Sequence, residues 1–179
     1  MIKNKATVSR VIFLFVLISV FSFSKDFWEK SRFTVNVTES LKMNKSVKTK
    51  RYVMTYSGGT LKLQMTYPAV NKGEIYTFTG NNKTIYYPSL NQTVTQKLHE
   101  DEANILSVFN KLNKITSKKT QTTNGDTFTF ENSWLTSIIS KGYKVNFSDY
   151  VKSGEYTYPS KISVTDGNSQ IIYRLSNFK

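Results

Sequence analysis

The stretch from residue 51 to residue 68 reads RYVMTYSGGTLKLQMTYP, and it sets the pattern for the whole chain. Apolar and polar residues alternate strictly from residue 61 to residue 67. The segment SGGT, residues 57–60, separates this run from a similar one at residues 51–56. Glycines accept the positive φ angles of a tight hairpin turn, and period-2 alternation is typical of a half-buried strand. The stretch therefore predicts a β-hairpin with one apolar face.

The same pattern continues on both sides of this hairpin. Gly-Asn or Asn-Gly turns stand near residues 80–82, 124–126 and 166–168. We expect ten strands, at residues 33–38, 51–56, 61–67, 74–79, 84–87, 92–98, 127–131, 142–148, 156–164 and 169–176. A long antiparallel sheet with few helices tends to curl on itself. The predicted fold is mainly β with a few helices (α+β), a curled antiparallel barrel or half barrel of about ten strands.

One helix is predicted among the strands, at residues 100–117. Three acids at its start, residues 100–102, and lysines toward its end suit the helix macrodipole. Its apolar residues recur at helical spacing and form one face, which must lie against the sheet. They are Ile105, Leu106, Phe109, Leu112 and Ile115.

Three other segments are less decided by their sequence. Residues 25–31 fit a short first helix, and residues 116–126 fit a polar loop. Residues 133–141 fit a helix capped by Ser133 and stopped by Gly142, but equally a bulged strand through Ile138 and Ile139.

The N-terminus has the pattern of an export signal. Lys3, Lys5 and Arg10 precede an apolar run of thirteen residues, 11–23, which ends among small residues. A membrane-spanning helix needs roughly 18 to 20 apolar residues, so a cleaved signal peptide at residues 1–24 is favoured over an uncleaved anchor. We expect the exported chain to be a single domain, residues 25–179.

Composition limits the chemistry of this domain. The chain has no cysteine, which excludes disulfides, thiolate metal sites and a lipid anchor on cysteine. Subtracting the three signal cations from 25 leaves 22 bases against 12 acids, a charge of about +10 that favours anionic surfaces. The densest basic runs, residues 45–51 and 111–119, fit solvated faces as well as binding sites.

No catalytic motif is present. The only histidine, His99, stands beside the acidic helix start, where a capping role or a solvent-exposed position is expected rather than catalysis. The Gly-X-Ser-X-Gly elbow, the calcium loop and the phosphate-binding loop are absent. We therefore expect no enzyme, no metal and no cofactor. Large apolar residues are abundant, with 12 Phe, 11 Tyr and 4 Met, and they can fill a solid core or line a space for an acyl chain.

The stretch GEIYTFTGNNKTIYYPSLNQ, residues 73–92, resembles the periplasmic lipoprotein carriers of the LolA family and their relatives with the same fold. That family has a strand, a Gly or Asn turn followed by Lys-Thr, an aromatic strand, Tyr-X-Pro and then Gln. Residues 83–88 match most tightly, and the preceding hairpin matches in layout. The likeness extends over nearly all of residues 25–179.

The resemblance implies a half barrel with a helical lid over a hydrophobic cavity for acyl chains. It also implies a soluble, monomeric carrier in the periplasm of a diderm bacterium. This carrier makes transient membrane contact and moves acylated lipoproteins or another lipid from an inner-membrane release complex to an outer-membrane acceptor. One feature departs from the family, whose carriers hold the lid with an Arg-Pro in the first hairpin strand. In this chain the equivalent positions are Tyr56-Ser57, and Arg51 lies too early in the strand to take the role of that arginine. An envelope sensor or adaptor that binds lipoproteins or a protein partner without transport is the alternative, and nucleic acid is not expected.

We predict ligand-contacting residues on the sheet and on the helix. A one-residue error in the pleat would exchange the inward and outward sets. The predicted sheet contributors are Met54, Leu61, Leu63, Met65, Tyr76, Phe78, Ile85 and Tyr87. The predicted lid contributors are Ile105, Leu106, Phe109 and Leu112.

Overall fold

The computed structural model describes residues 24–43, 46–98, 105–167 and 169–179. The predicted signal peptide, apart from Ser24, and the predicted acidic start of the helix lie outside the described residues. Among the described residues, no helix is both long enough and apolar enough to span a membrane.

Thirteen strands of the described chain join in one sheet. They are β1 (Lys25–Asp26), β2 (Arg32–Met43), β3 (Ser46–Ser57), β4 (Thr60–Tyr67), β5 (Ile75–Thr79), β6 (Asn82–Tyr87), β7 (Gln92–Lys97), β8 (Gln121–Thr123), β9 (Asp126–Glu131), β10 (Trp134–Ser140), β11 (Tyr143–Ser153), β12 (Tyr156–Asp166) and β13 (Ser169–Ser176). The spatial order is β7-β6-β5-β4-β3-β2-β13-β12-β11-β10-β9-β8, with β1 added to β12. All neighbours are antiparallel except β1 and β12.

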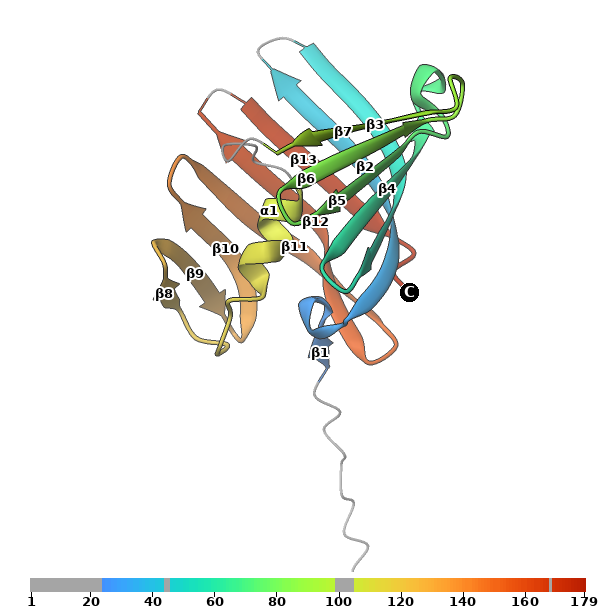
Figure 1. Ribbon diagram of the computed structural model, residues 1–179. Helices are drawn as coiled ribbons and strands as arrows, with labels where there is room; N and C mark the ends of the chain where they lie inside the picture. Colours follow the sequence, from blue (N-terminus) through green and yellow to red (C-terminus); the bar gives the residue numbers. More distant parts are fainter. Residues whose placement is uncertain (1–23, 44–45, 99–104, 168) are drawn as a thin grey trace, which may run out of the picture.

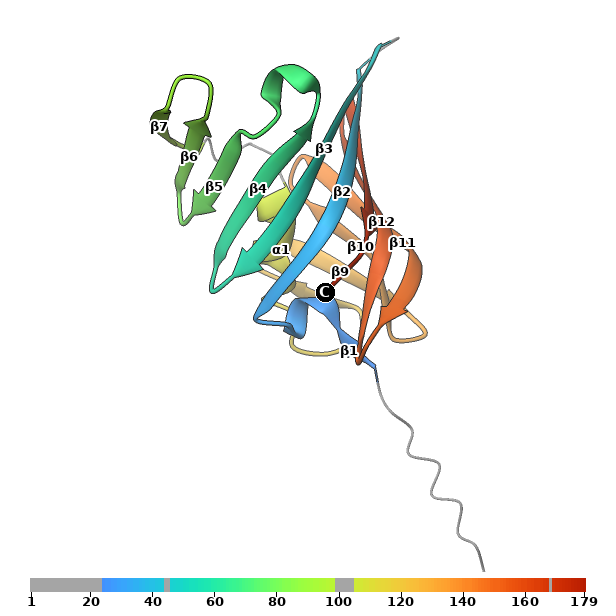
Figure 2. The same cartoon turned by 90° about the vertical axis from the view of Figure 1, so that its right-hand side faces the viewer.

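The sheet curls without closing. Its edges are β7 and β8, which do not pair with each other. Figure 1 shows the strands from β2 to β7 and those from β8 to β13 as two wings around a concave face. The helix α1 (Ile105–Leu112) lies within this concavity, and Figure 2 shows it on the inner side of the sheet. The predicted unclosed, curled antiparallel sheet is therefore confirmed.

All ten predicted strands are present, but the count of about ten is too low because β1 and β8 were not predicted and β10 had been left open between a helix and a bulged strand. The segment 133–141 is the strand β10, with a bulge between Leu135 and Ser137 that interrupts the alternation. The predicted polar loop at 116–126 contains the short edge strand β8. The predicted first helix at 25–31 is instead β1 followed by the 3-10 helix η1 (Phe27–Glu29).

The predicted helix end at residue 117 is also wrong, because α1 ends at Leu112. The next residues form tight turns, in which the amides of Lys114 and Ile115 donate to the carbonyls of Lys111 and Leu112. Asn, Thr and Ser favour such local turns over helix, and Asn113, Thr116 and Ser117 all follow Leu112. A second 3-10 helix, η2 (Ala69–Asn71), follows β4.

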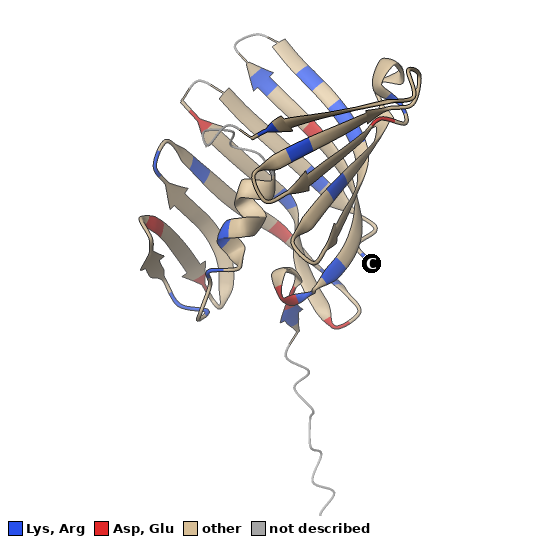
Figure 3. Cartoon of the chain, viewed as in Figure 1, with Lys and Arg blue, Asp and Glu red and all other residues tan. Residues whose placement is uncertain are grey.

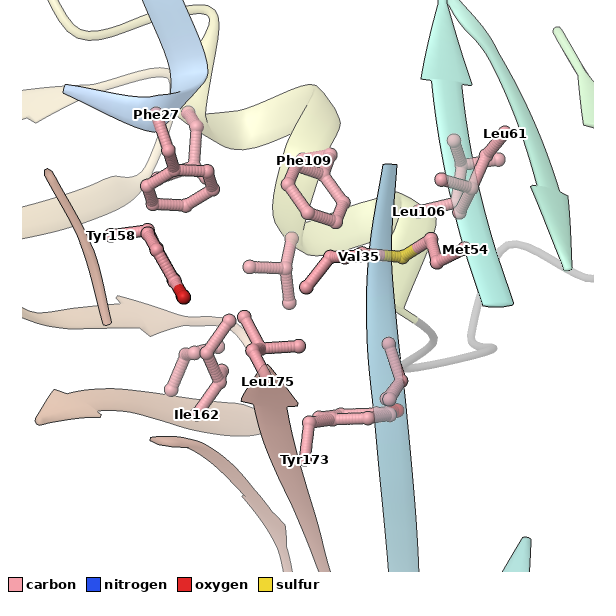
Figure 4. Packing of buried hydrophobic residues seen from close by; sticks show 14 of the residues in the cluster. Phe27, Val35, Met54, Leu61, Leu106, Phe109, Tyr158, Ile162, Tyr173 and Leu175 are labelled. Carbon is pink, nitrogen blue, oxygen red and sulfur yellow. The ribbon is translucent and has the colours of Figure 1, made fainter. Parts of the chain in front are cut away.

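The two faces of the sheet differ in chemistry as the alternation predicts. Gly58 and Gly59 of the quoted hairpin have positive φ angles of 56° and 79°, which the tight turn requires. The convex face carries polar pairs between neighbouring strands, and several are threonine pairs: Thr34 with Thr55, Thr60 with Thr79, Thr84 with Thr95, and Thr122 with Thr127. The concave face is largely apolar and forms the core with α1 (Figure 4). Lysines and arginines are spread over both wings (Figure 3).

Candidate functional site

An apolar row crosses six strands on the concave face. Strand register places its members side by side in the order Val35, Met54, Leu63, Tyr76, Ile85 and Val94, from β2 to β7. Val35 and Met54 are fully buried, Leu63 and Ile85 are 8% and 7% exposed, and Val94 is 47% exposed. The row thus runs from the packed centre of the sheet to an uncovered end on the edge strand β7.

The predicted sheet residues share this concave face. Six of them are buried: Met54, Leu61, Leu63, Met65, Phe78 and Ile85. Tyr76 and Tyr87 are partly buried. Tyr76 directs its hydroxyl to Oε2 of Glu74 at 2.7 Å, and burial together with this carboxylate raises the pKa of Tyr76. Their role as ligand contacts stays a prediction, but their arrangement on one face is now established.

Three of the four predicted lid residues of α1 are buried against the sheet. Leu106, Phe109 and Leu112 are buried, and Ile105 begins the helix with its side chain outside the described part. The Phe109 ring lies 5.5 Å from the Phe33 ring and 5.8 Å from the Phe27 ring, centroid to centroid. Figure 4 shows Phe27, Val35, Phe109 and Leu175 converging in this region. At this end α1 is part of a solid aromatic core.

The other side of α1 is polar and faces β9, β10 and β11. Lys111 Nζ lies 2.6 Å from Asp126 Oδ1 and 3.1 Å from Ser140 Oγ. Lys114 Nζ lies 3.5 Å from Asp126 Oδ2, and the hydroxyls of Ser107 and Tyr143 are 2.8 Å apart. Burial raises the pKa of Asp126, but hydrogen bonds from Lys111 and Ser140 and the charges of both lysines outweigh it, so its pKa is lowered. The ion pair of Lys111 with Asp126, which we call the clasp, thus holds α1 to the second wing, the one formed by β8 to β13.

Sequence reasoning missed this clasp. The departure from the LolA family pattern falls at Tyr56, and the structure shows that the Tyr56 ring lies 6.1 Å from the Phe109 ring of α1. Arg51 stands over the Tyr67 ring, 5.3 Å from its centroid, and is exposed. The sequence presents Lys111 and Lys114 as helix-dipole partners and as part of a basic run, and nothing in it links them to Asp126.

A separate cleft opens between η1 and the turns after α1. Its volume is about 350 Å³. It is lined by Asp26, Trp28, Glu29, Leu112, Asn113, Ile115, Thr116, Ser117 and Lys118. Lys118 Nζ is 2.7 Å from Asp26 Oδ2, although the angles do not make a hydrogen bond. The cleft differs from the apolar space that the sequence predicts, because acids, hydroxyls and a lysine share its wall with apolar residues.

A metal-binding cluster is not found within the described ranges, where no three His, Cys, Asp or Glu side chains are grouped to hold an ion.

No protein-family model matches this chain, and no curated protein matches its sequence. Solved structures do match it. A LolA superfamily protein from Nitrosomonas europaea superimposes with a TM-score of 0.57 at 12% identity, covering 88% of this chain and 89% of that one. This chain has a LolA-like fold.

Two further structures agree with the LolA-like fold. A putative outer membrane lipoprotein-sorting protein domain from Vibrio parahaemolyticus has a TM-score of 0.57 at 10% identity, over 87% of this chain and 86% of that one. A DUF1329 family protein from Desulfovibrio piger has a TM-score of 0.59 at 10% identity, over 83% and 85%. At such low identity the likeness is one of fold, so function must be argued from the residues of this chain.

Proposed function

We propose that this protein is a non-enzymatic carrier that binds the acyl chain of a lipid or lipoprotein on the concave face of its sheet. The observation that carries this proposal is the apolar row from Met54 to Val94, which continues beyond the packed centre to an exposed end. A row that served only the core would be expected to end in polar residues at the edge strand. The likeness in fold to the lipoprotein-sorting domain from Vibrio parahaemolyticus agrees with this proposal.

The energy available to such a site is large. At about 0.8 kcal/mol per buried methylene, a chain of about sixteen carbons gains on the order of 12 kcal/mol before ordering costs. Transfer of this chain through water would be slow, so a carrier needs an element that opens. The only α-helix of the described chain, α1, lies over the concave face and is the element suited to that role.

We propose that α1 acts as the gate. Met54, Leu61 and Leu112 are fully buried, so an acyl chain can reach the centre of the row only when α1 moves away from the sheet. Phe109 holds α1 by aromatic packing, and the clasp of Lys111 with Asp126 holds it by charge. The clasp supplies here the closing contact that the LolA family takes from an arginine.

The wider route belongs to the same proposal. An exported protein with this fold would take an acylated cargo from the inner membrane and deliver it to an acceptor at the outer membrane. The exposed, mixed surface with lysines on both wings suits transient contact with anionic membranes or partners.

A vesicle transfer assay tests the proposal. Donor vesicles carrying a fluorescent lipid and a labelled acylated peptide are mixed with unlabelled acceptor vesicles, with and without the purified protein. The proposal expects transfer of an acylated probe that increases with protein concentration. Binding without transfer would instead favour the sensor or adaptor function, and absence of binding to either probe would contradict acyl recognition.

A further inference from the structure

The cleft between η1 and the turns after α1 contains a buried acid, Asp26, whose carboxylate belongs to the capping box of η1 and pairs with Lys118. The Asp26 side chain is 3% exposed, and Oδ2 receives no hydrogen bond from any described residue. The side chain of its cationic neighbour, Lys118, is 43% exposed. Among the described residues, the Lys118 ammonium, 2.7 Å away, is the group that offsets the cost of burying this carboxylate oxygen, so a ligand ammonium can take the same place.

The walls of the cleft offer complementary chemistry. Trp28 presents an aromatic surface, and Glu29 adds a second acid on the same side. Thr116, Ser117 and Lys118 supply two hydroxyls and an ammonium on the opposite segment. Carboxylates and aromatic faces attract ammonium groups, whereas hydroxyls and a lysine attract anions.

We propose that this cleft binds a zwitterion whose ammonium and phosphate are separated by a short linker, as in an ethanolamine phosphate group. The ligand ammonium takes the place of Lys118 at Asp26 Oδ2, beside Trp28. The released Lys118 ammonium then pairs with the ligand phosphate, together with the hydroxyl of Ser117, whereas the Thr116 hydroxyl already donates to Gln121 Oε1. The exchange keeps every charge paired, and no bond is made or broken.

The position of the cleft connects it with the acyl site, and to this extent the inference rests on the proposed function. Leu112 lines the cleft and is also fully buried in the core beneath α1. A lipid whose tail lies under α1 could therefore place its head group in the cleft. The same chemistry also exists in free phosphoethanolamine, so the two sources must be separated by experiment.

Trp28 provides the readout. The chain has two tryptophans, and Trp134 lies on β10 with its ring 4.8 Å from the Tyr150 ring, outside the cleft. In a Trp134→Phe background, the fluorescence of Trp28 reports the cleft alone. We expect phosphoethanolamine to shift this signal with a Kd on the order of 1 mM, because a small ligand makes few contacts. Ethanolamine and inorganic phosphate, each lacking one charge, should bind more weakly.

Matched variants test the two charges. Asp26→Asn and Lys118→Met should each weaken phosphoethanolamine binding by about tenfold, because each removes a charged partner. Glu155→Gln and Lys119→Met are the controls, since both residues are exposed and neither lines the cleft. They should leave the affinity unchanged. The proposal would be overturned if Asp26→Asn bound phosphoethanolamine as tightly as the parent chain, or if the fluorescence of Trp28 did not respond to phosphoethanolamine.

Experiments with vesicles distinguish a lipid head group from free phosphoethanolamine as the ligand, and they distinguish the cleft proposal from the acyl-carrier proposal. Phosphatidylethanolamine vesicles should shift the Trp28 signal, and phosphatidylglycerol vesicles with the same acyl chains should not. A response to free phosphoethanolamine but not to these vesicles would assign the cleft to a soluble zwitterion and overturn the head-group source. Because phosphoethanolamine has no acyl chain, its binding tests the cleft even if acyl transfer fails in the vesicle assay.

Discussion

The Nζ atom of Lys111 lies 2.6 Å from Oδ1 of Asp126, and this pair fastens α1 to the first residue of β9. Asp126 is 5% exposed and Lys111 is 16% exposed, so water screens the pair only weakly. The contact joins the helix over the concave face to a strand near the far edge of the second wing (Figure 1). Its strength should therefore set how readily α1 leaves the sheet.

Replacement of Asp126 tests the clasp. Asp126→Asn leaves the Lys111 ammonium without its carboxylate, and we expect the free energy of unfolding to fall by about 3 kcal/mol. Exchange of a bound acyl probe should also become faster, because the helix opens more often. Urea unfolding measures the first effect and stopped-flow release of the probe measures the second.

Lys114→Met is the matched control for the clasp. Lys114 lies farther from Asp126, at 3.5 Å, and is 37% exposed, so its removal should cost less than about 1 kcal/mol. If both variants cost the same, the pairing of Lys111 would not be the contact that holds the helix.

The stability of the protein should fall in acid because of Asp126. Its pKa in the folded protein lies below the ordinary value of 3.8. The folded state therefore binds this proton less readily than the unfolded chain, and the stabilisation is present above the ordinary pKa. It is lost as the pH falls through the lowered folded pKa. Urea unfolding between neutral pH and about pH 3 should show a shallower acid loss in Asp126→Asn than in the parent chain.

Asp26 should behave in the opposite way. Burial raises its pKa, and the nearby ammonium of Lys118 only partly opposes this, while Glu29 adds to the rise. The folded protein thus binds this proton more readily, so the charged form costs stability at neutral pH and the cost disappears as the pH falls through the raised pKa. Another neighbouring group, Tyr150, has its own pKa raised by burial and by Asp26.

We therefore expect Asp26→Asn to leave the melting temperature at neutral pH unchanged or slightly higher. An uncharged side chain of the same shape removes the cost of a buried charge. Thermal unfolding followed by circular dichroism measures this directly. A loss as large as that of Asp126→Asn would mean that Asp26 is a structural latch, and it would remove the support for a ligand at the cleft.

The exposed end of the apolar row can be tested on one strand. Val94 and Thr95 are neighbours on β7 whose side chains point to opposite faces, Val94 on the concave and Thr95 on the convex side. Val94→Lys should weaken binding of an acyl probe by about tenfold, since it places a charge in the path of the chain. Thr95→Lys should leave binding unchanged.

Both β7 variants should unfold like the parent chain, because both positions are exposed. Fluorescence titration of the probe decides between them. Equal affinities would place the acyl chain elsewhere than on this row.

The alternation of the sequence was sufficient to predict the sheet and its inward face. Leu61, Leu63 and Met65 lie on the concave side as the period-2 pattern requires, because a pleated strand has no other way to bury all three. The pattern failed where the strand itself is irregular. In β10 the bulge between Leu135 and Ser137 shifts the phase, so Ile138 and Ile139 fit a helix as well as they fit a strand.

The parts of the site that depend on contacts distant in sequence could not be predicted. Lys111 and Asp126 are brought together only because α1 folds across the concave face, and Asp26 meets Lys118 only because η1 lies beside the turns after α1. Local signals also misplaced the end of the helix, since the lysines at 114 and 118 suited a longer helix dipole. In the structure the first pairs with Asp126 and the second with Asp26.

Native mass spectrometry of the purified, exported protein is the sharpest test of acyl binding. We expect a population heavier than the polypeptide by the mass of one acylated molecule, which is released on activation and is depleted in Val94→Lys but not in Thr95→Lys. The opposite finding is a protein that stays at its polypeptide mass after purification and after incubation with lipid vesicles and acylated peptide. The concave face would then form only the hydrophobic core and would bind no acyl chain.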